Sequence, residues 1–113
     1  MIERSLDFSV SIVKLHQYLI RTKKETVISK QLIRSGTSIG ANINEANYGQ
    51  SRGDFISKMH IALKEAAETE YWLRVLIRSE YLCEEKGVTI LRDCLELKRM
   101  LIASINTARA NKQ

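Results

Sequence analysis

The sequence predicts an all-α protein: a single domain, residues 1–113, folded as an up-down-up-down antiparallel four-helix bundle. Three observations lead to this prediction. The 113 residues suffice for one modest hydrophobic core. They include no proline and only five glycines, the residues that most often interrupt helices. Apolar residues recur at intervals of three and four along four segments, as in amphipathic helices, and short turns between such segments make consecutive helices antiparallel.

The first two helices are predicted over residues 5–21 and 25–47. The first carries apolar residues at intervals of four, three and four, at Phe8, Ile12, Leu15 and Leu19. Thr22, followed three residues later by Glu25, resembles a capping box that opens the second helix. The sequence Tyr48-Gly49-Gln50 then breaks that helix.

The third helix is predicted over residues 51–82, opened by Ser51 with Asp54 three residues later. Two apolar stripes run along it and share their centre, which predicts a wide buried face. One stripe is Ile56, Met59, Leu63, Ala66, Glu70, Leu73 and Ile77. The other is Phe55, Met59, Ala62, Ala66, Thr69, Leu73 and Leu76.

The fourth helix is predicted over residues 86–110, with Gly87 and Thr89 as competing start signals. Cys94 lies on its apolar face, and Cys83 lies in the preceding turn. The two cysteines are eleven residues apart without a C-x-x-C pair, so they indicate neither a zinc site nor a disulfide framework. We expect both to be reduced, with Cys94 inert in the core.

The run "SGTSIGANINEANYGQ", residues 35–50, combines small residues and amides with the apolar spacing of a helix. One seam along it is Ile28, Leu32, Ser35, Ile39, Asn42 and Ala46, and a second is Ile33, Gly36, Gly40 and Ile43. Each glycine costs about 1 kcal/mol of helix propensity relative to alanine. We therefore expect Gly36 and Gly40 to lie where a neighbouring backbone approaches closely.

Asn42 falls inside the first of these seams. A buried amide without partners costs about 1–3 kcal/mol, and a lone asparagine in a seam can fix register and partner choice. We interpret Asn42 as a hydrogen-bonded core amide that specifies packing. The alternative is a residue that contacts a ligand.

The charge of the chain is +5, and the excess lies in its first half. Residues 1–52 hold eight Lys or Arg against four Asp or Glu, whereas residues 53–113 hold ten against nine. Such an excess is mild evidence for a polyanionic partner. The candidate nucleic-acid contacts are Lys30, Arg34, Lys64, Arg74 and Arg78, and ordinary solvation is the alternative for these charges. Tyr71 and Trp72 beside them suit either base stacking or, as we favour for Trp72, a subunit interface.

Glu65, Glu68 and Glu70 raise the question of a metal site, because some bundles hold di-iron centres. Those sites need Glu-x-x-His pairs on facing helices, and neither His16 nor His60 has a Glu three residues before it. We therefore expect ion pairing at these carboxylates and no metal. No cofactor or small-molecule substrate is indicated.

Histidine phosphotransfer is the other chemistry that a four-helix bundle suggests. The sequence "HIALKEA" places Leu and Lys one residue later than that motif requires, and it puts Glu65 where a small residue would admit a partner. We interpret His60 as a partly packed surface histidine. With no nucleophile–base arrangement and no glycine-rich phosphate loop, the sequence predicts a protein that is not an enzyme.

No uncharged apolar stretch approaches the roughly 18–20 residues that a membrane crossing needs, and the start, MIERSLDF, has no apolar leader. We therefore expect a soluble, cytoplasmic protein without membrane association.

The segments "KQLIRSGTSIGANINEA" and "IALKEAAETEYWLRVLIRSEYL" resemble the four-helix-bundle proteins encoded within intervening sequences of bacterial 23S rRNA genes. The motif positions are Gln31, Arg34, Ser35, Ser38, Ile39, Asn42, Ile43 and Glu45. The resemblance implies a homopentameric ring, association with RNA or another nucleic acid, and no established enzyme activity. The expected structural or interface residues are Ser35, Gly36, Gly40, Asn42, Glu45, Tyr71 and Trp72.

Two hypotheses follow for the function. In the first, a non-catalytic homo-oligomer binds RNA or another nucleic acid through its summed basic surface. In the second, a ring-shaped protein–protein adaptor or scaffold has no direct nucleic-acid role. Both assume a homo-oligomer, which the overlapping seams of the second and third helices also favour, because they offer more apolar surface than one small bundle needs.

Overall fold

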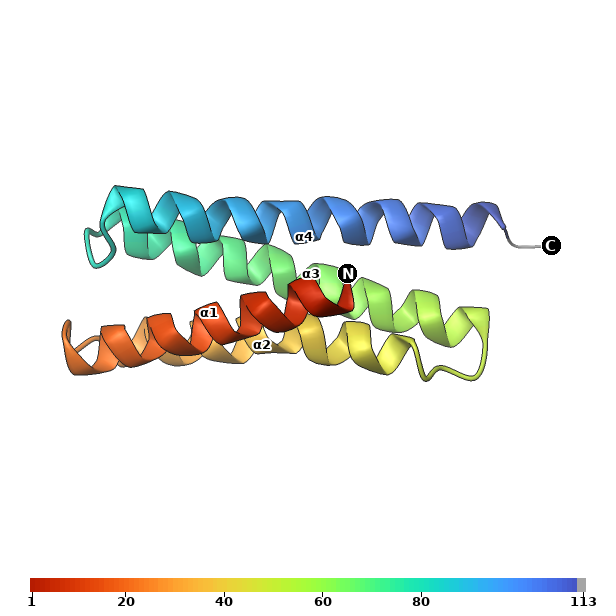
Figure 1. Ribbon diagram of the computed structural model, residues 1–113, viewed down its shortest axis with the longest axis horizontal. Coiled ribbons are helices and arrows are strands. Elements are labelled where there is room, and N and C mark those ends of the chain that lie inside the picture. The colour runs from red at the N-terminus through yellow and green to blue at the C-terminus, as the bar shows by residue number, and fades with distance from the viewer. Residues whose placement is uncertain (112–113) are drawn as a thin grey trace.

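The computed structural model describes residues 1–111, which form four helices joined by short turns (Figure 1). The helices are α1 (Ile2–Arg21), α2 (Val27–Ala46), α3 (Arg52–Arg78) and α4 (Glu84–Ala110). Consecutive helices run in opposite directions, so the predicted all-α antiparallel bundle is confirmed. The molecule is elongated, with extents of 51, 20 and 20 Å.

The helices pack mainly with their neighbours along the chain. α2 lies between α1 and α3, and α3 lies between α2 and α4. α1 touches α4 over only a short stretch. Figure 1 accordingly shows α1 with α2 on one side of the bundle and α3 with α4 on the other.

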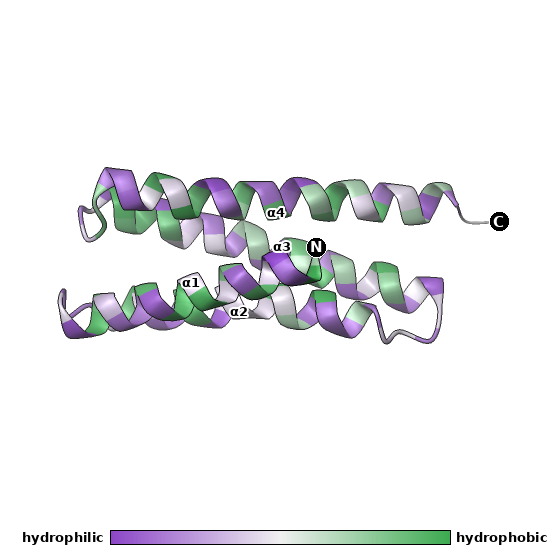
Figure 2. Cartoon of the chain, in the orientation of Figure 1, coloured by the Kyte–Doolittle hydropathy of each residue, from purple (hydrophilic) through white to green (hydrophobic). Residues whose placement is uncertain are grey.

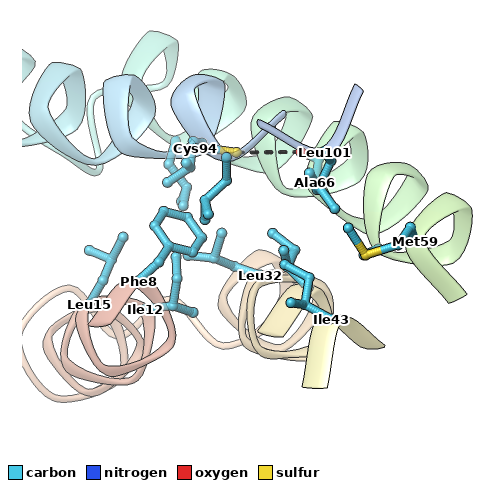
Figure 3. Packing of buried hydrophobic residues seen from close by; sticks show 14 of the residues in the cluster. Phe8, Ile12, Leu15, Leu32, Ile43, Met59, Ala66, Cys94 and Leu101 are labelled. Atoms are coloured by element: carbon cyan, nitrogen blue, oxygen red, sulfur yellow. Dashed lines mark hydrogen bonds between the residues drawn. The ribbon is translucent and has the colours of Figure 1, made fainter. Parts of the chain in front are cut away.

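Each helix contributes one apolar side to a common core. Figure 2 shows apolar and polar residues alternating along every helix at helical spacing. In Figure 3, Phe8 and Ile12 of α1, Leu32 of α2, Ala66 of α3 and Leu101 of α4 are drawn together in this core. The fully buried large side chains include Ile12, Leu19, Leu32, Ile39, Ile43, Met59, Leu73, Leu76 and Leu101.

The two stripes predicted on α3 have different roles. The stripe that contains Thr69 is the buried one: Met59, Ala62, Ala66, Thr69, Leu73 and Leu76. In the stripe that contains Glu70, the residues that do not also belong to the other stripe are only half-buried. Two of them face α4: Glu70 contacts Lys98, and Ile77 lies against Gly87. The wide buried face of α3 therefore serves two neighbours within one chain.

The start of α2 differs from the predicted capping box. Thr22 ends α1, because its N–H still bonds the Tyr18 carbonyl at 2.9 Å. Glu25 caps α2 alone: its carboxylate accepts the N–H groups of Val27, Ile28 and Ser29 at 3.2, 3.1 and 2.7 Å. α2 therefore begins at Val27, two residues later than predicted.

The end of α3 also differs from the prediction. The helix begins as expected, with Ser51 Oγ accepting the Asp54 N–H at 3.1 Å, but it ends at Arg78 rather than residue 82. Glu80 adopts a left-handed conformation, with φ of 66°, and the Tyr81 N–H returns to the Leu76 carbonyl at 3.0 Å. This is the usual way a helix terminates, although glycine more often occupies that position.

Two other boundaries are earlier than predicted. α1 begins at Ile2 rather than residue 5, and α4 begins at Glu84 rather than 86. Neither Gly87 nor Thr89 starts α4. Gly87 is buried in its first turns, where an added Cβ would lie 2.5 Å from Cγ1 of Ile77, so the glycine lets α4 pack closely on α3.

The close approach predicted at Gly36 and Gly40 is confirmed, and the neighbour is α1. A Cβ on Gly36 would lie 2.8 Å from Cγ2 of Ile12, and a Cβ on Gly40 would lie 3.3 Å from the Ser5 carbonyl oxygen. The glycine seam of α2 is thus used inside the bundle. Ile28, Ile33, Ile56 and Leu63 of the α2 and α3 seams are only half-buried, so the expected surplus of apolar surface stays a prediction.

Candidate nucleic-acid interface

The five candidate cations are all exposed, but two of them are already paired. The Arg34 guanidinium contacts the carboxylates of Glu68 and Glu65 on α3, the latter at 3.4 Å. Arg74 Nε donates to Glu70 at 3.0 Å on its own helix. A phosphate would have to compete with these carboxylates for Arg34 and Arg74.

Lys30, Lys64 and Arg78 make no ion pair within residues 1–111. The contacts of Arg34 with Glu68 and of Ser35 with Thr69 set the register between α2 and α3. In this register Arg78 is level with the start of α2, whose first turn carries Lys30, whereas Lys64 lies further along α3. The structure therefore brings two of the five candidates to one end of the bundle.

The ion-pairing interpretation of Glu65, Glu68 and Glu70 is confirmed. Arg34 contacts the first two, and Glu70 accepts from Lys98 Nζ at 2.8 Å as well as from Arg74. The hydrogen bond from Lys98 is the main cause that lowers the pKa of Glu70 below its ordinary value of 4.5. No cluster of three or more potential metal ligands occurs among residues 1–111.

We expect Glu70→Gln to destabilise the protein by about 1 kcal/mol at neutral pH, because the variant loses a charged link between α3 and α4. A lowered carboxyl pKa contributes stability above the unfolded value near 4.5, and this contribution disappears as the pH falls through the folded value. Urea unfolding at pH 7 and pH 3 should therefore give a difference from wild type that is smaller at pH 3. Asp93→Asn is the control, at an exposed carboxylate that makes no ion pair within residues 1–111. An equal loss at both pH values would contradict the assignment.

Ser35 and Gly36, predicted as structural or interface residues, lie inside the bundle. Ser35 is fully buried, and its Oγ accepts from the Thr69 hydroxyl of α3 at 2.9 Å. Thr69 Oγ1 also lies 2.8 Å from the Glu65 carbonyl oxygen. These buried hydroxyls satisfy one another across the α2–α3 contact, so they stabilise one chain rather than an interface between chains.

Asn42 is hydrogen-bonded, as expected, but it is not a core residue. Its side chain is half-buried, and Nδ2 donates to the Ser38 carbonyl of its own helix at 2.8 Å. The helix turns the amide toward the edge of the seam, where it bonds back along α2 instead of crossing to another helix. Glu45 is exposed and accepts from Lys58 of α3 at 2.8 Å, which is again a contact within the chain.

Trp72 and Tyr71 occupy different environments. Trp72 is half-buried against the core, and its Nε1 donates to Glu68 at 3.0 Å. Tyr71 is 60% exposed and meets Trp72 edge-to-face, with ring centroids 5.1 Å apart. Trp72 therefore packs within its own chain, and Tyr71 is the aromatic side chain that a partner can reach.

Cys94 and His60, the other titratable residues considered for chemistry, are both packed against neighbouring residues. Cys94 is buried, its Sγ lies 3.4 Å from the Ala66 carbonyl (Figure 3), and burial raises the pKa of its thiol to about 12. Cys94 is thus a protonated core residue at neutral pH, as expected. His60 is half-buried beside Arg109, at 2.8 Å, which confirms it as a partly packed surface histidine.

Two surfaces were not found by reasoning from the sequence. The first is the α1–α2 turn, where Arg21, Lys23 and Lys24 are exposed. The run "RTKK" is the sequence signal for this basic surface. Helical spacing does not detect it, because spacing relates only cations that share one helix. The second is an exposed apolar stripe on α1: Ile2, Leu6, Val10 and Val13. Its members lie four, four and three residues apart, beside the buried stripe of the same helix.

None of the helices within residues 1–111 combines the length and apolar character that crossing a bilayer requires.

Comparison with known proteins places this geometry in a family. Residues 1–103 match the family model described as 23S rRNA-intervening sequence protein. The chain belongs to this family. The match extends from α1 into the second half of α4 and confirms the resemblance carried by the glycine-containing run of α2.

A solved structure is similar over almost the whole chain. It is a crystal structure of a protein with unknown function from the S23 ribosomal protein family, from Bacteroides thetaiotaomicron VPI-5482. The identity is 55%, the alignment covers 92% of this chain and 96% of that chain, and the TM-score is 0.91. Among curated proteins, none matches the chain significantly. Neither matching description names a catalytic activity.

Proposed function

We propose that this protein is a non-catalytic homo-oligomer that binds RNA or another nucleic acid through exposed basic side chains. The observation that carries the proposal is a set of exposed cations that have no carboxylate partner among the described residues, on a chain with a formal charge of +5. Membership of a family described by a 23S rRNA intervening sequence supports RNA as the polyanion.

The distribution of ion pairs favours a phosphate-binding role for some cations over others. Five carboxylates, Glu45, Glu65, Glu68, Glu70 and Glu96, already contact Arg or Lys side chains. Lys30, Lys64 and Arg78 have no such partner among residues 1–111 and can exchange counterions for phosphates. Arg34 instead links α2 to α3, and Arg74 pairs with Glu70 on its own helix.

The exposed stripe of α1 supports self-association. Its four apolar side chains are each between 36% and 55% exposed. Beside it, a shallow groove of about 380 Å³ between α1 and α2 is lined by Ile2, Leu6, Gly40 and Ala41 among others. Small residues along this groove leave room for side chains of a second molecule, and continuous apolar surface of this kind commonly marks an interface.

Charge complementarity favours a second copy of the same chain as the occupant. Glu3 and Asp7 flank the α1 stripe, and neither makes an ion pair within the described residues. α4 carries two further exposed apolar residues, Val88 and Ile102. Between them lie Arg92 and Arg99, which make no ion pair within residues 1–111. Contact between α1 of one copy and α4 of the next joins unlike surfaces, and such a head-to-tail contact forms a ring when its rotation closes. The family resemblance supports five subunits.

A titration of labelled single-stranded RNA tests the proposed function. We expect binding at about 50 mM salt that weakens steeply by about 200 mM, with a log–log slope of roughly −0.7 for each phosphate contacted. Little sequence preference is expected, because phosphate contacts carry no base information. Absence of binding at the lower salt would overturn the nucleic-acid role.

The exposed apolar stripe of α1 also favours a second candidate function, a protein–protein adaptor or ring-shaped scaffold. Pull-downs from nuclease-treated and untreated lysate separate the two. Partners that depend on intact nucleic acid support the first function, and partners retained after nuclease support the adaptor.

A further inference from the structure

We propose that RNA phosphates bind at one end of the bundle, on cations carried by the α1–α2 turn and by the adjacent ends of α2 and α3. This surface, the basic end, consists of Arg21, Lys23, Lys24, Lys30 and Arg78, all of them exposed. The inference rests on the proposed nucleic-acid-binding function and assigns its contact site.

The backbone of the turn holds its cations in a defined arrangement. The Thr22 N–H bonds the Tyr18 carbonyl and the Glu25 N–H bonds the Leu19 carbonyl, both at 2.9 Å. Between them Lys24 adopts a left-handed conformation, with φ of 58°. A non-glycine residue held in that region requires support from the surrounding structure. The side chains of Lys23 and Lys24 therefore project from a fixed turn, and phosphate binding need not order the backbone.

The one carboxylate in this stretch is turned away from solvent. Among residues 21–30, Glu25 is the sole acid, and it is 8% exposed. Its two oxygens accept three N–H groups at the start of α2, where the helix dipole also favours a negative charge. The capping arrangement thus satisfies the acid internally, while Arg21, Lys23, Lys24 and Lys30 remain without an ion pair within the described chain.

Arg78 joins this surface from the end of α3. The register set by the α2–α3 contacts places it level with the start of α2, and Figure 1 shows the α1–α2 and α3–α4 turns at the same end of the molecule. The α3–α4 side of that end is different in charge, because Glu80, Glu84 and Glu85 are exposed there. The acidic turn sets the boundary of the basic end and would keep a polyanion over α1, α2 and the last turn of α3.

The composition of the basic end fits a nucleic-acid backbone better than a lipid surface. In the α1–α2 portion of the basic end, the large apolar side chain that faces solvent is Val27, which is 74% exposed. Surface-binding membrane helices instead place a continuous apolar face below their cations. Several flexible lysines around a turn are suited to successive phosphates, for which electrostatic attraction needs no base-specific geometry.

The experiment compares two variants that each remove three positive charges. Lys23→Gln/Lys24→Gln/Lys30→Gln removes three of the five cations of the basic end. Arg52→Gln/Lys58→Gln/Arg109→Gln removes three cations toward the opposite end of the bundle, none of them a candidate phosphate contact. Each is titrated with labelled single-stranded RNA at about 50 and about 200 mM salt, and circular dichroism verifies folding. We expect the first variant to lose about tenfold or more in affinity at low salt and to reduce the slope by about two. The second should change affinity less than about twofold.

The outcomes separate this inference from the function on which it rests. Equal losses in both variants would mean diffuse binding over the surface, which overturns the basic end and leaves RNA binding standing. No binding by wild type would overturn the proposed function itself. Sedimentation with vesicles containing anionic lipid is run alongside. Wild type that binds these vesicles but not RNA would assign the cations to a membrane surface instead. Single substitutions, Lys23→Gln and Lys30→Gln, replace the triple variant if it fails to fold.

Discussion

Gly36→Val is expected to lower the free energy of unfolding by about 2–3 kcal/mol, as measured by urea denaturation followed by circular dichroism. Valine is a slightly better helix former than glycine, so propensity alone predicts a small gain. Packing predicts the opposite, because even the first added carbon would lie 2.8 Å from Cγ2 and 2.9 Å from Cγ1 of Ile12. Ile12 is fully buried and can yield only if α1 shifts. Overpacking of this kind typically costs about 1–3 kcal/mol.

Gly53→Val is the matched control for this substitution. Gly53 also lies in a helix, but an added Cβ would meet only Ser51 Oγ, at 3.7 Å. We expect this variant to be as stable as wild type or slightly more so. Adding Ile12→Ala to Gly36→Val should recover part of the loss, since it removes the atoms that the valine strikes, whereas Ile12→Ala alone leaves a cavity. Equal stability of Gly36→Val and Gly53→Val would show that the close approach of α1 and α2 is not needed.

The glycines of α2 illustrate which part of the fold the sequence predicts well. Their position on an apolar seam indicates close approach, and the structure has that approach. The periodicity does not indicate which helix approaches, because a seam records only that a side of the helix is covered. The sequence alone therefore leaves open whether these glycines serve the bundle or a subunit interface, and the structure shows that the neighbour is α1 of the same chain.

The helix ends were predicted less well, for a local reason. Lys24 and Glu80 both adopt left-handed backbone conformations, and neither is the glycine that usually signals such a turn. Without that signal, the sequence pattern predicts Thr22 as a cap for α2 and an α3 that ends four residues too late. Glu25 was correctly associated with the start of α2, but its carboxylate acts on three N–H groups by itself.

The candidate site was predicted only in part, because ion pairs between helices are invisible in a linear sequence. Arg34 and Glu68 lie 34 residues apart and meet across α2 and α3. Lys30 and Arg78 share one end of the bundle for the same reason: the register between these helices brings distant residues together. Helical spacing identifies which cations share a face of one helix, but the opposing carboxylates decide which of them are available to a phosphate.

The stripe on α1 shows the same limit for apolar residues. Leu6 and Val10 lie beside the buried stripe of Phe8 and Ile12, and their spacing alone gives no reason to expect that they face solvent. The structure leaves them exposed because α2 covers α1 on one side and α4 touches it only briefly. Because these side chains are exposed, one substitution to a charged residue in the stripe tests self-association.

Leu6→Glu is expected to convert the assembled protein into a 13 kDa monomer, as measured by sedimentation at micromolar concentration. Leu6 is 55% exposed in the single chain, so the substitution should leave the helix content unchanged. In an assembly the new carboxylate would be buried against apolar groups without a partner, which costs several kcal/mol at every interface. Ile61→Glu, on the outward side of α3 and 39% exposed, makes the same kind of change away from both proposed contact surfaces and should remain assembled. If Leu6→Glu stays assembled, the interface lies elsewhere than the α1 stripe. If wild type itself sediments only at 13 kDa, the proposed homo-oligomer is wrong, because a surface that is never covered at this concentration cannot build a ring.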